Sequence, residues 1–252
     1  MSSIHERIAT PEGKRRYVRS LFATIAGRYD LITVILSYGQ DRRWKRRLID
    51  LAHLPSLPAP AGGVRALDLA TGTGDIAFGL SRCADRVVGL DVTQSMIAIA
   101  AAKASMRRGQ GDTQVPRFLV GDMLALPFPS GSFDIVTTGY GLRNVPDLGQ
   151  AVDEILRVLK PGGQALSLDF DKPSNRVVLV PYLLYLTIVG AVLGWLLHRD
   201  SDTYRYIPAS IRRYPGAAAV VRLLEKRGFE RVRHYPVLGG LMAIHHAWKP
   251  CT

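Results

Sequence analysis

Short apolar runs alternate with longer stretches of amphipathic pattern from Val64 to the C-terminal end of the chain. Apolar runs between turn residues are typical of buried strands, and apolar residues at helical spacing are typical of helices. Elements that alternate in this way form a mostly parallel sheet with helices on both faces. The predicted strands are Val64–Leu69, Arg86–Asp91, Arg117–Val120, Phe133–Thr138, Gln164–Phe170, Glu230–Tyr235 and Leu241–Trp248. The predicted helices are Asp75–Ala84, Thr93–Arg108, Leu148–Leu159 and Ala217–Arg227.

In the N-terminal part, roughly residues 11–54, apolar residues recur only at helical spacing. Val18, Leu21 and Ile25 recur at intervals of three and four residues, so this part is expected to form helices with one apolar face. A Pro/Gly-rich stretch, His53–Gly63, separates these helices from the first predicted strand. The N-terminal helices are therefore predicted to pack as a cap over the α/β domain.

A run of 21 residues without a charge, Val177–Leu197, follows the fifth predicted strand. It is long enough to cross a membrane, but the two strands predicted after it must rejoin the sheet, which argues against a single crossing. Pro181, Gly190 and Gly194 are expected to break it into shorter helices. We expect a helical lid that lies in the membrane interface or lines an apolar channel; the alternative is a pair of buried core helices.

Composition adds a strong positive charge to this picture. The 252 residues suffice for one large domain, and 33 Lys and Arg against 21 Asp and Glu give a net charge of +12. Basic clusters at Lys14–Arg19, Arg42–Arg47 and Lys226–His234 would attract nucleic acid or an anionic membrane surface. The chain begins without a secretory signal pattern, and Cys83 and Cys251 lack metal-site spacing, so we expect a cytoplasmic protein without a metal site.

A glycine-rich turn follows the first predicted strand in "LDLATGTGDIA", Leu67–Ala77. In an open α/β sheet the ligand lies beyond the carboxyl ends of the strands, and this turn forms the floor of its site. Gly72 and Gly74 would let the backbone bend tightly and approach a ligand. With Ala77 they also satisfy the dinucleotide-binding pattern, which on its own is weak support for a pyrophosphate ligand.

Three aspartates at strand ends favour another ligand. Asp68 and Asp91 lie at the ends of the first and second predicted strands, and Asp122 follows the third. A carboxylate after the second strand can accept hydrogen bonds from ribose hydroxyls, whereas further carboxylates would repel a pyrophosphate. A cationic nucleoside without phosphate, S-adenosylmethionine, fits all three. The alternative is that these aspartates only cap local turns.

Several longer motifs resemble a known family, the class I S-adenosylmethionine-dependent C-methyltransferases of ubiquinone and menaquinone biosynthesis. The likeness runs from about Phe22 to Lys249. It rests on "RYDL" (Arg28–Leu31), "LSYGQDRRWKRR" (Leu36–Arg47), "LDLATGTGD" (Leu67–Asp75), "ALPFPSGSFD" (Ala125–Asp134), "YGLRNV" (Tyr140–Val145), "RVLKPGG" (Arg157–Gly163), "YRYIPASIRRYP" (Tyr204–Pro215) and "GGLMAIHHAWKP" (Gly239–Pro250). The chain departs from the family at Thr33, where Asn is usual, and in "DFDKP" (Asp169–Pro173), where "EFSKP" is usual.

The resemblance implies a Rossmann-like fold with a seven-stranded sheet. It divides the chain into a helical cap and linker (1–60), an S-adenosylmethionine-binding core (61–172), an apolar insertion (173–215), and a last helix with two strands of the same domain (216–252). The family's contacts with the cofactor correspond to Thr73, Asp91, Asp122 and Met123, and Tyr29 belongs to the part that closes over it. The full set of predicted cofactor-binding residues is Tyr29, Asp68, Gly72, Thr73, Gly74, Asp91, Asp122, Met123 and Gly139.

Methyl transfer to a ring carbon needs loss of a phenolic proton and stabilisation of the phenolate. Tyr140, Arg143 and Asn144 follow the fourth strand and are the predicted catalytic residues. Arg143 would stabilise the phenolate or orient a water that takes the proton, although an ion pair that fixes the loop is the alternative. His245 and His246 are further candidate acceptors; alternation along a strand would bury one and expose the other.

Three functions stay open at this point. The first is methylation of a prenylated quinol, with S-adenosylmethionine as cofactor and peripheral attachment to the anionic inner membrane. The second is methylation of another lipophilic phenol or of RNA; nucleic acid is not the expected partner, because the "TTGYGLRN" segment (Thr137–Asn144) lacks the residues typical of base methylation. The third is a non-catalytic cofactor-binding protein. A homodimer or a biosynthetic complex is compatible with each.

Overall fold

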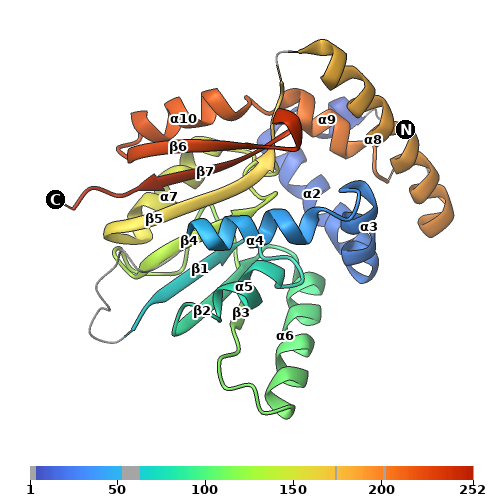
Figure 1. Cartoon of the computed structure of the whole chain (residues 1–252). Helices are drawn as coiled ribbons and strands as arrows, with labels where there is room; N and C mark the ends of the chain where they lie inside the picture. The colour runs from blue at the N-terminus through green and yellow to red at the C-terminus, as the bar shows by residue number, and fades with distance from the viewer. Residues whose placement is uncertain (1–3, 53–62, 174, 201–202, 252) are drawn as a thin grey trace.

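A seven-stranded sheet forms the centre of the molecule in the computed structural model, which describes residues 4–52, 63–173, 175–200 and 203–251 (Figure 1). Its strand order is β3-β2-β1-β4-β5-β7-β6; the strands from β3 to β5 pair in parallel, and β7 pairs antiparallel with both β5 and β6. The strands are β1 (Arg65–Leu69), β2 (Arg86–Asp91), β3 (Arg117–Val120), β4 (Phe133–Gly139), β5 (Leu159–Phe170), β6 (Glu230–Val237) and β7 (Met242–Trp248). The mostly parallel α/β fold predicted from the sequence is confirmed.

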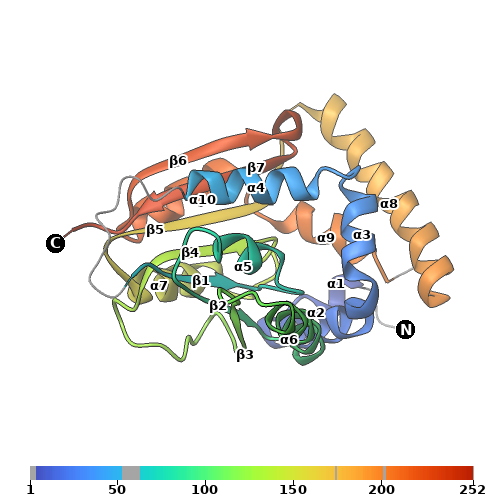
Figure 2. The same cartoon turned by 60° about the horizontal axis from the view of Figure 1, so that its bottom comes forward.

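Helices cover both faces of this sheet (Figure 2). On one face α7 and α10 pack against the strands through residues such as Val152 and Val220, and on the other face α4 and α5 pack through Leu48 and Ile76. Burial of both faces explains why six successive residues of β4, Phe133 to Thr138, are buried. The helices that accompany the sheet are α4 (Asp41–Leu51), α5 (Asp75–Leu80), α6 (Gln94–Gly109), α7 (Leu148–Val158) and α10 (Ala217–Lys226).

A second apolar cluster lies beyond the carboxyl ends of the parallel strands. It is formed by the N-terminal helices together with the insertion, as the predicted cap requires, and buries Leu21 and Ile32 against Leu186 and Tyr206. The short turns η1 (Ala26–Arg28) and η3 (Leu238–Gly240) border it. Its helices are α1 (Ile4–Arg7), α2 (Pro11–Ile25), α3 (Tyr29–Leu36), α8 (Arg176–His198) and α9 (Tyr206–Arg213). The predicted linker lies, except for Gly63, outside the described residues.

The insertion differs from the prediction, because α8 is one continuous helix of 23 residues. Pro181 lies near its exposed start, where loss of one backbone hydrogen bond costs little, since water can bind the freed carbonyl. Gly190 is tolerated because a side chain there would meet Cβ of Tyr204 at 3.1 Å, so the glycine lets α8 pack closely. Gly194 accepts the backbone N–H of Asp200 at 3.2 Å where the helix ends. The expectation that these three residues break the run is wrong.

Two smaller expectations also fail. The fifth strand, predicted to begin at Gln164, begins five residues earlier, at Leu159. His245 and His246 are both buried, because β7 lies inside the sheet with neighbours on each side and covered faces. His245 contacts the Ser167 hydroxyl at 3.1 Å, and His246 lies 2.8 Å from the Gln164 side-chain oxygen, so each has a structural partner.

The buried histidines predict acid-sensitive stability. Burial lowers the pKa of His245 and His246 from 6.5 to about 4. Between these values the unfolded chain binds more protons than the folded chain, so the folded state loses stability as pH falls through this window. His246→Gln should reduce the loss between about pH 6.5 and pH 4.5 by about 1–2 kcal/mol. Urea unfolding of both proteins at the two pH values measures it; an equal loss in both would contradict the assignment.

Candidate active site

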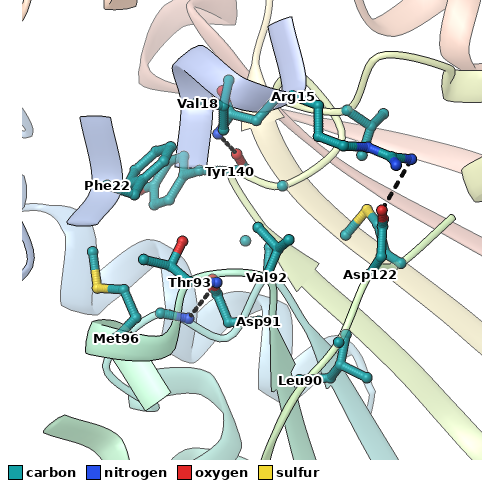
Figure 3. A pocket seen from close by; sticks show the side chains of 18 of the residues that line it. Arg15, Val18, Phe22, Leu90, Asp91, Val92, Thr93, Met96, Asp122 and Tyr140 are labelled. Atoms are coloured by element: carbon teal, nitrogen blue, oxygen red, sulfur yellow. Dashed lines mark hydrogen bonds and ion pairs between the residues drawn. The ribbon is translucent and has the colours of Figure 1, made fainter. Parts of the chain in front are cut away.

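A cleft lies at the carboxyl ends of β1, β2 and β4, where the strand order reverses and a ligand site is expected (Figure 3). We call it the strand-end cleft; its space, counted out to solvent, is about 740 Å³. Its lining residues are Arg15, Val18, Phe22, Tyr29, Ala70, Gly72, Leu90, Asp91, Val92, Thr93, Met96, Gly121, Asp122, Met123, Gly139, Tyr140, Gly141, Asn144, Val145 and Pro146. Most of the predicted cofactor-binding residues are therefore brought together.

The floor of the cleft is the glycine turn after β1. Gly72 and Gly74 have φ values of +55° and +93°, which residues with a Cβ rarely adopt. The Gly72 N–H donates to Asp91 Oδ2 at 2.9 Å, and the Thr93 N–H donates to Asp91 Oδ1 at 2.8 Å. Asp91 thus ties the turn to the end of β2. Burial raises the pKa of this carboxyl, and the two backbone hydrogen bonds oppose that rise.

The occupied N–H of Gly72 bears on the choice of ligand. A pyrophosphate in this position would need free backbone donors, whereas Gly72 already donates to a carboxylate. The ionisable side chains that border the cleft include two carboxylates, Asp91 and Asp122, and one cation, Arg15. Two carboxylates and one cation suit a cationic nucleoside and disfavour the dinucleotide that the glycine pattern alone would allow.

Three predicted residues do not border the cleft. Asp68 lies beneath it, 1% exposed, and accepts the hydroxyls of Thr71 at 2.6 Å and Thr137 at 2.8 Å. Burial raises the pKa of Asp68 to about 7. Thr73 donates its hydroxyl to Asp30 Oδ1 at 2.6 Å and so connects the turn to α3. Gly74, the third, serves the turn geometry.

Asp122 and Arg15 form an ion pair at one end of the cleft, with 3.0 Å between Arg15 Nη2 and Asp122 Oδ2 (Figure 3). Arg15 comes from α2, so the cap contributes a side chain to this end. The other carboxylate oxygen, Oδ1, accepts the Leu124 N–H at 2.9 Å. Met123 lies beside Asp122 in the same wall.

A second cavity adjoins the first, with a space of about 670 Å³ counted in the same way. We call it the aromatic cavity, because side chains of Phe, Tyr and Trp dominate its walls. Phe22, Tyr29 and Tyr140 line both cavities and therefore mark their junction. The residues that line the aromatic cavity are Leu21, Phe22, Ile25, Tyr29, Ile32, Thr33, Leu36, Ser37, Trp44, Tyr140, Arg143, Phe170, Tyr182, Tyr204, Tyr206 and Ile207.

Arg143 is the permanently charged residue in the wall of the aromatic cavity and is 6% exposed. Its Nε lies 3.2 Å from Asp169 Oδ1, its backbone N–H donates to Asp169 Oδ2 at 2.9 Å, and Nη1 donates to the Ser210 hydroxyl. The ion pair that was the alternative role of Arg143 is present. It fixes the guanidinium in the cavity wall, so it is compatible with the catalytic role.

Tyr140 and Asn144 keep the turn after β4 in shape. Tyr140 has a φ of +60°, an uncommon conformation for a bulky residue and one that favours a functional constraint. Its hydroxyl donates to Asp41 Oδ1 at 2.7 Å, and its carbonyl accepts the Asn144 side chain at 2.7 Å. The Tyr206 hydroxyl in turn donates to the Asn144 side-chain oxygen at 3.0 Å.

The sequence pattern missed several of these contacts. Lys14 of α2 donates to the carbonyl oxygens of Arg143 at 3.0 Å and Val145 at 2.6 Å, and burial lowers its pKa to about 8. Lys45 lies within the basic cluster Arg42–Arg47 and Asp41 directly precedes it, yet both are buried. Their helical spacing with Trp44 and Leu48 was the available signal, since it places all four on one face.

Comparison with solved structures agrees with this geometry. A Thermotoga maritima protein, described as an S-adenosylmethionine-dependent methyltransferase and possible histamine N-methyltransferase, is similar with a TM-score of 0.60. The match covers 92% of this chain and 99% of that chain at 17% identity, which defines the fold. This likeness and the strand order together define a Rossmann-like methyltransferase fold.

Sequence comparison identifies the family. The model of the ubiE/COQ5 methyltransferase family matches residues 10–249. A demethylmenaquinone methyltransferase of Thermus thermophilus is 41% identical over 91% of this chain and all of its own length. A ubiquinone/menaquinone biosynthesis C-methyltransferase of Pseudomonas entomophila is 37% identical over 94% of this chain and 90% of its own. The chain belongs to the ubiE/COQ5 methyltransferase family and is an S-adenosylmethionine-dependent C-methyltransferase of quinone biosynthesis.

Substitution of Asp91 and of Asp68 should distinguish a residue that binds the cofactor from one that stabilises the fold. Asp91 borders the cleft and Asp68 does not, so Asp91→Asn should weaken binding of S-adenosylhomocysteine by roughly tenfold or more, and Asp68→Asn by clearly less. Asp68→Asn should instead lower the free energy of unfolding by about 1 kcal/mol. Calorimetric titration and urea unfolding of both variants measure this. Equal losses of affinity would contradict the placement.

Proposed function

We propose that the aromatic cavity binds the ring of a prenylated hydroquinone and that the strand-end cleft binds S-adenosylmethionine. The observation that supports this most directly is the junction of the two cavities at Phe22, Tyr29 and Tyr140. Reactants bound on the two sides of this junction would lie close together, which supplies much of the acceleration in a two-reactant step. The apolar walls suit an aromatic ring with an isoprenoid tail.

Arg143 stabilises the phenolate form of the ring in this proposal. The cofactor supplies an electrophilic methyl group, and the ring carbon beside an ionised hydroxyl is the nucleophile. The guanidinium of Arg143 is charged at any working pH, borders the aromatic cavity, and is fixed by Asp169 and Ser210. A pre-oriented cation in a dry site stabilises developing negative charge more strongly than the same group in water.

We also propose that α8 attaches the protein to an anionic membrane at the cytoplasmic side. Along this helix Val180, Leu184, Ile188, Val192 and Leu196 recur every four residues and are each more than half exposed. α8, which carries this apolar stripe, lies at the edge of the molecule next to α3 (Figures 1 and 2). Leu31 and Val34 of α3 are exposed as well, and so is Tyr38, which follows this helix. An exposed apolar area of this kind is typical of a membrane or protein contact.

The features around the stripe favour a membrane as its partner. α8 is long and apolar enough to cross a bilayer, and 33% of its most apolar window is buried. Trp195 lies near its C-terminal end with the Arg199 guanidinium 5.5 Å above its ring, a pairing that suits the interface of a bilayer. The aromatic cavity lies behind α3 and α8, so a substrate dissolved in the bilayer would reach it by a short path.

Arg143→Ala tests the catalytic assignment. It should lower kcat by roughly 100-fold or more while the dissociation constant of S-adenosylhomocysteine changes little, because Arg143 borders the aromatic cavity and not the strand-end cleft. Arg143→Lys keeps a positive charge, so its kcat should fall less than that of Arg143→Ala. Turnover of a short-chain prenylated hydroquinone measures both, with thermal unfolding as the check on folding. Full turnover by Arg143→Ala would show that the assignment is wrong.

The double substitution Leu184→Glu and Ile188→Glu tests membrane attachment. It should reduce several-fold the fraction of protein that floats with anionic liposomes at low salt, because it places charges in the apolar stripe. Met106→Glu is the matched control, since Met106 is also exposed but lies on α6, away from α8. Wild-type protein that stays entirely in the soluble fraction, or equal loss in the control, would contradict the proposal.

A further inference from the structure

A buried carboxylate lies behind the tyrosine that the two cavities share. Asp41, the first residue of α4, is 2% exposed, and its Oδ1 accepts the Tyr140 hydroxyl at 2.7 Å. Its Oδ2 lies 2.6 Å from Nζ of Lys45, one turn further along α4. Lys45 also contacts Asp75 Oδ2 at 2.9 Å. A buried carboxylate is costly unless it is paired, and here a cation and a phenol supply its partners.

The surroundings of Asp41 form one wall of the aromatic cavity. Ser37 and Trp44 line this cavity, and the Asp41 N–H donates to the Ser37 hydroxyl oxygen at 3.1 Å. Burial raises the pKa of Tyr29 to about 12, while Lys45 and Asp41 act on it in opposite directions, so both charges lie near this junction residue. Tyr140 therefore lines both cavities, and its hydroxyl is bonded to a carboxylate that lies behind the wall of the aromatic cavity.

Other candidate bases at this edge have fixed partners. Asp169 pairs with Arg143, and Arg143 itself is always protonated. Asp91 accepts two backbone N–H groups in the strand-end cleft. His245 and His246 have partners within the sheet and do not border the aromatic cavity. Among the described residues, Asp41 is the carboxylate that bonds directly to a side chain at the junction.

We propose that Tyr140 and Asp41 form the proton acceptor for the substrate hydroxyl, with Tyr140 as the catalytic residue and Asp41 as the residue that acts through it. This inference rests on the proposed function, since it requires a phenolic substrate in the aromatic cavity. The Tyr140 oxygen donates its proton to Asp41 and still has lone pairs that can accept a hydrogen bond from the substrate.

Protons and electrons balance over one turnover. The substrate O–H bond breaks and its proton binds Tyr140 Oη, while the Tyr140 proton moves to Asp41 Oδ1. The ring carbon forms a bond to the methyl group, and the electrons of the broken C–S bond stay on sulfur. Loss of the ring C–H proton to water restores the aromatic ring as a phenolate, and the stored proton returns to its oxygen. One proton is released for each methyl group transferred.

The local charges support this transfer. When Asp41 becomes neutral, the negative charge moves to the substrate oxygen, which lies in the cavity that Arg143 borders. Lys45 keeps Asp75 as its partner, so no buried cation is left alone. Burial acts to lower the pKa of Lys45, but Asp41 and Asp75 raise it above its ordinary value.

A second tyrosine of the aromatic cavity also has a base behind it. The Tyr204 hydroxyl lies 2.9 Å from His198 Nε2, at the end of α8. Tyr204 lines the aromatic cavity but not the strand-end cleft, whereas Tyr140 lines both. His198→Gln therefore provides a matched control, because it removes a base behind a cavity tyrosine that lies away from the junction.

Kinetics of the full chain with S-adenosylmethionine and a short-chain prenylated hydroquinone test the proposal. Asp41→Asn keeps an oxygen that can accept a hydrogen bond from the Tyr140 hydroxyl but removes the base. Tyr140→Phe removes the hydroxyl that connects the substrate to Asp41. Each should lower kcat by about 100-fold, and the double variant should be no worse than the poorer single variant. In both, log kcat should rise steadily from about pH 6 to about pH 9, because the substrate must then ionise in solvent. His198→Gln should keep the wild-type profile.

An acidic substrate distinguishes proton transfer from support of the fold. A halogenated hydroquinone ionises at lower pH, so it should restore much of the turnover of Asp41→Asn and Tyr140→Phe. If the loss of kcat is the same for both substrates, or if both variants keep the wild-type kcat and pH profile, the relay is wrong. If Asp41→Asn does not fold, the kinetics of Tyr140→Phe alone test the relay. A wild type that binds S-adenosylhomocysteine but does not methylate the hydroquinone would instead contradict the proposed function.

Discussion

The buried contact between Asp169 and Arg143 is the interaction on which the active edge depends. Asp169, near the end of β5, accepts both the backbone N–H and the Nε of Arg143, and so fixes the turn that follows β4. That turn includes Tyr140, which separates the two cavities, and Asn144, which borders the strand-end cleft. Loss of one partner from a buried ion pair costs about 3–5 kcal/mol, because the other charge is left without compensation. The same pair therefore shapes the wall of the aromatic cavity and orients the guanidinium within it.

The cap completes both cavities through polar contacts that cross from helix to strand end. Lys14 donates to carbonyls of the turn after β4, Arg15 pairs with Asp122, and Asp30 accepts the Thr73 hydroxyl of the glycine turn. Asp41 accepts the Tyr140 hydroxyl at the junction. The cofactor-binding edge and the N-terminal helices are therefore parts of one site, although most of the apolar packing of the cap is with α8 and α9.

The features that can be predicted best from the sequence are those that depend on a local pattern of residues. The strands, the glycine turn and the aspartates at strand ends follow from apolar runs and turn residues, and parallel strands necessarily bring their ends to one edge. The partnership of Tyr140 with Asp41 joins residues 99 positions apart, so no local pattern could reveal it. The break expected in α8 failed because packing of Gly190 against Tyr204 outweighs the weak helix propensity of glycine. The roles of Asp68 and Asp91 likewise depend on which of them borders the cleft, a property of packing that the sequence does not encode locally.

The proposed methyl transfer requires that a cationic methyl donor and a phenolic ring meet at Tyr140. The most direct measurement uses S-adenosylmethionine with a deuterated methyl group and a prenylated hydroquinone that lacks the ring methyl, with the product examined by NMR and mass spectrometry. We expect the deuterated methyl on the ring carbon next to a hydroxyl, with one S-adenosylhomocysteine formed for each methyl transferred. A methyl ether, or no transfer to a hydroquinone that binds in the presence of the cofactor, would contradict the proposed methyl transfer.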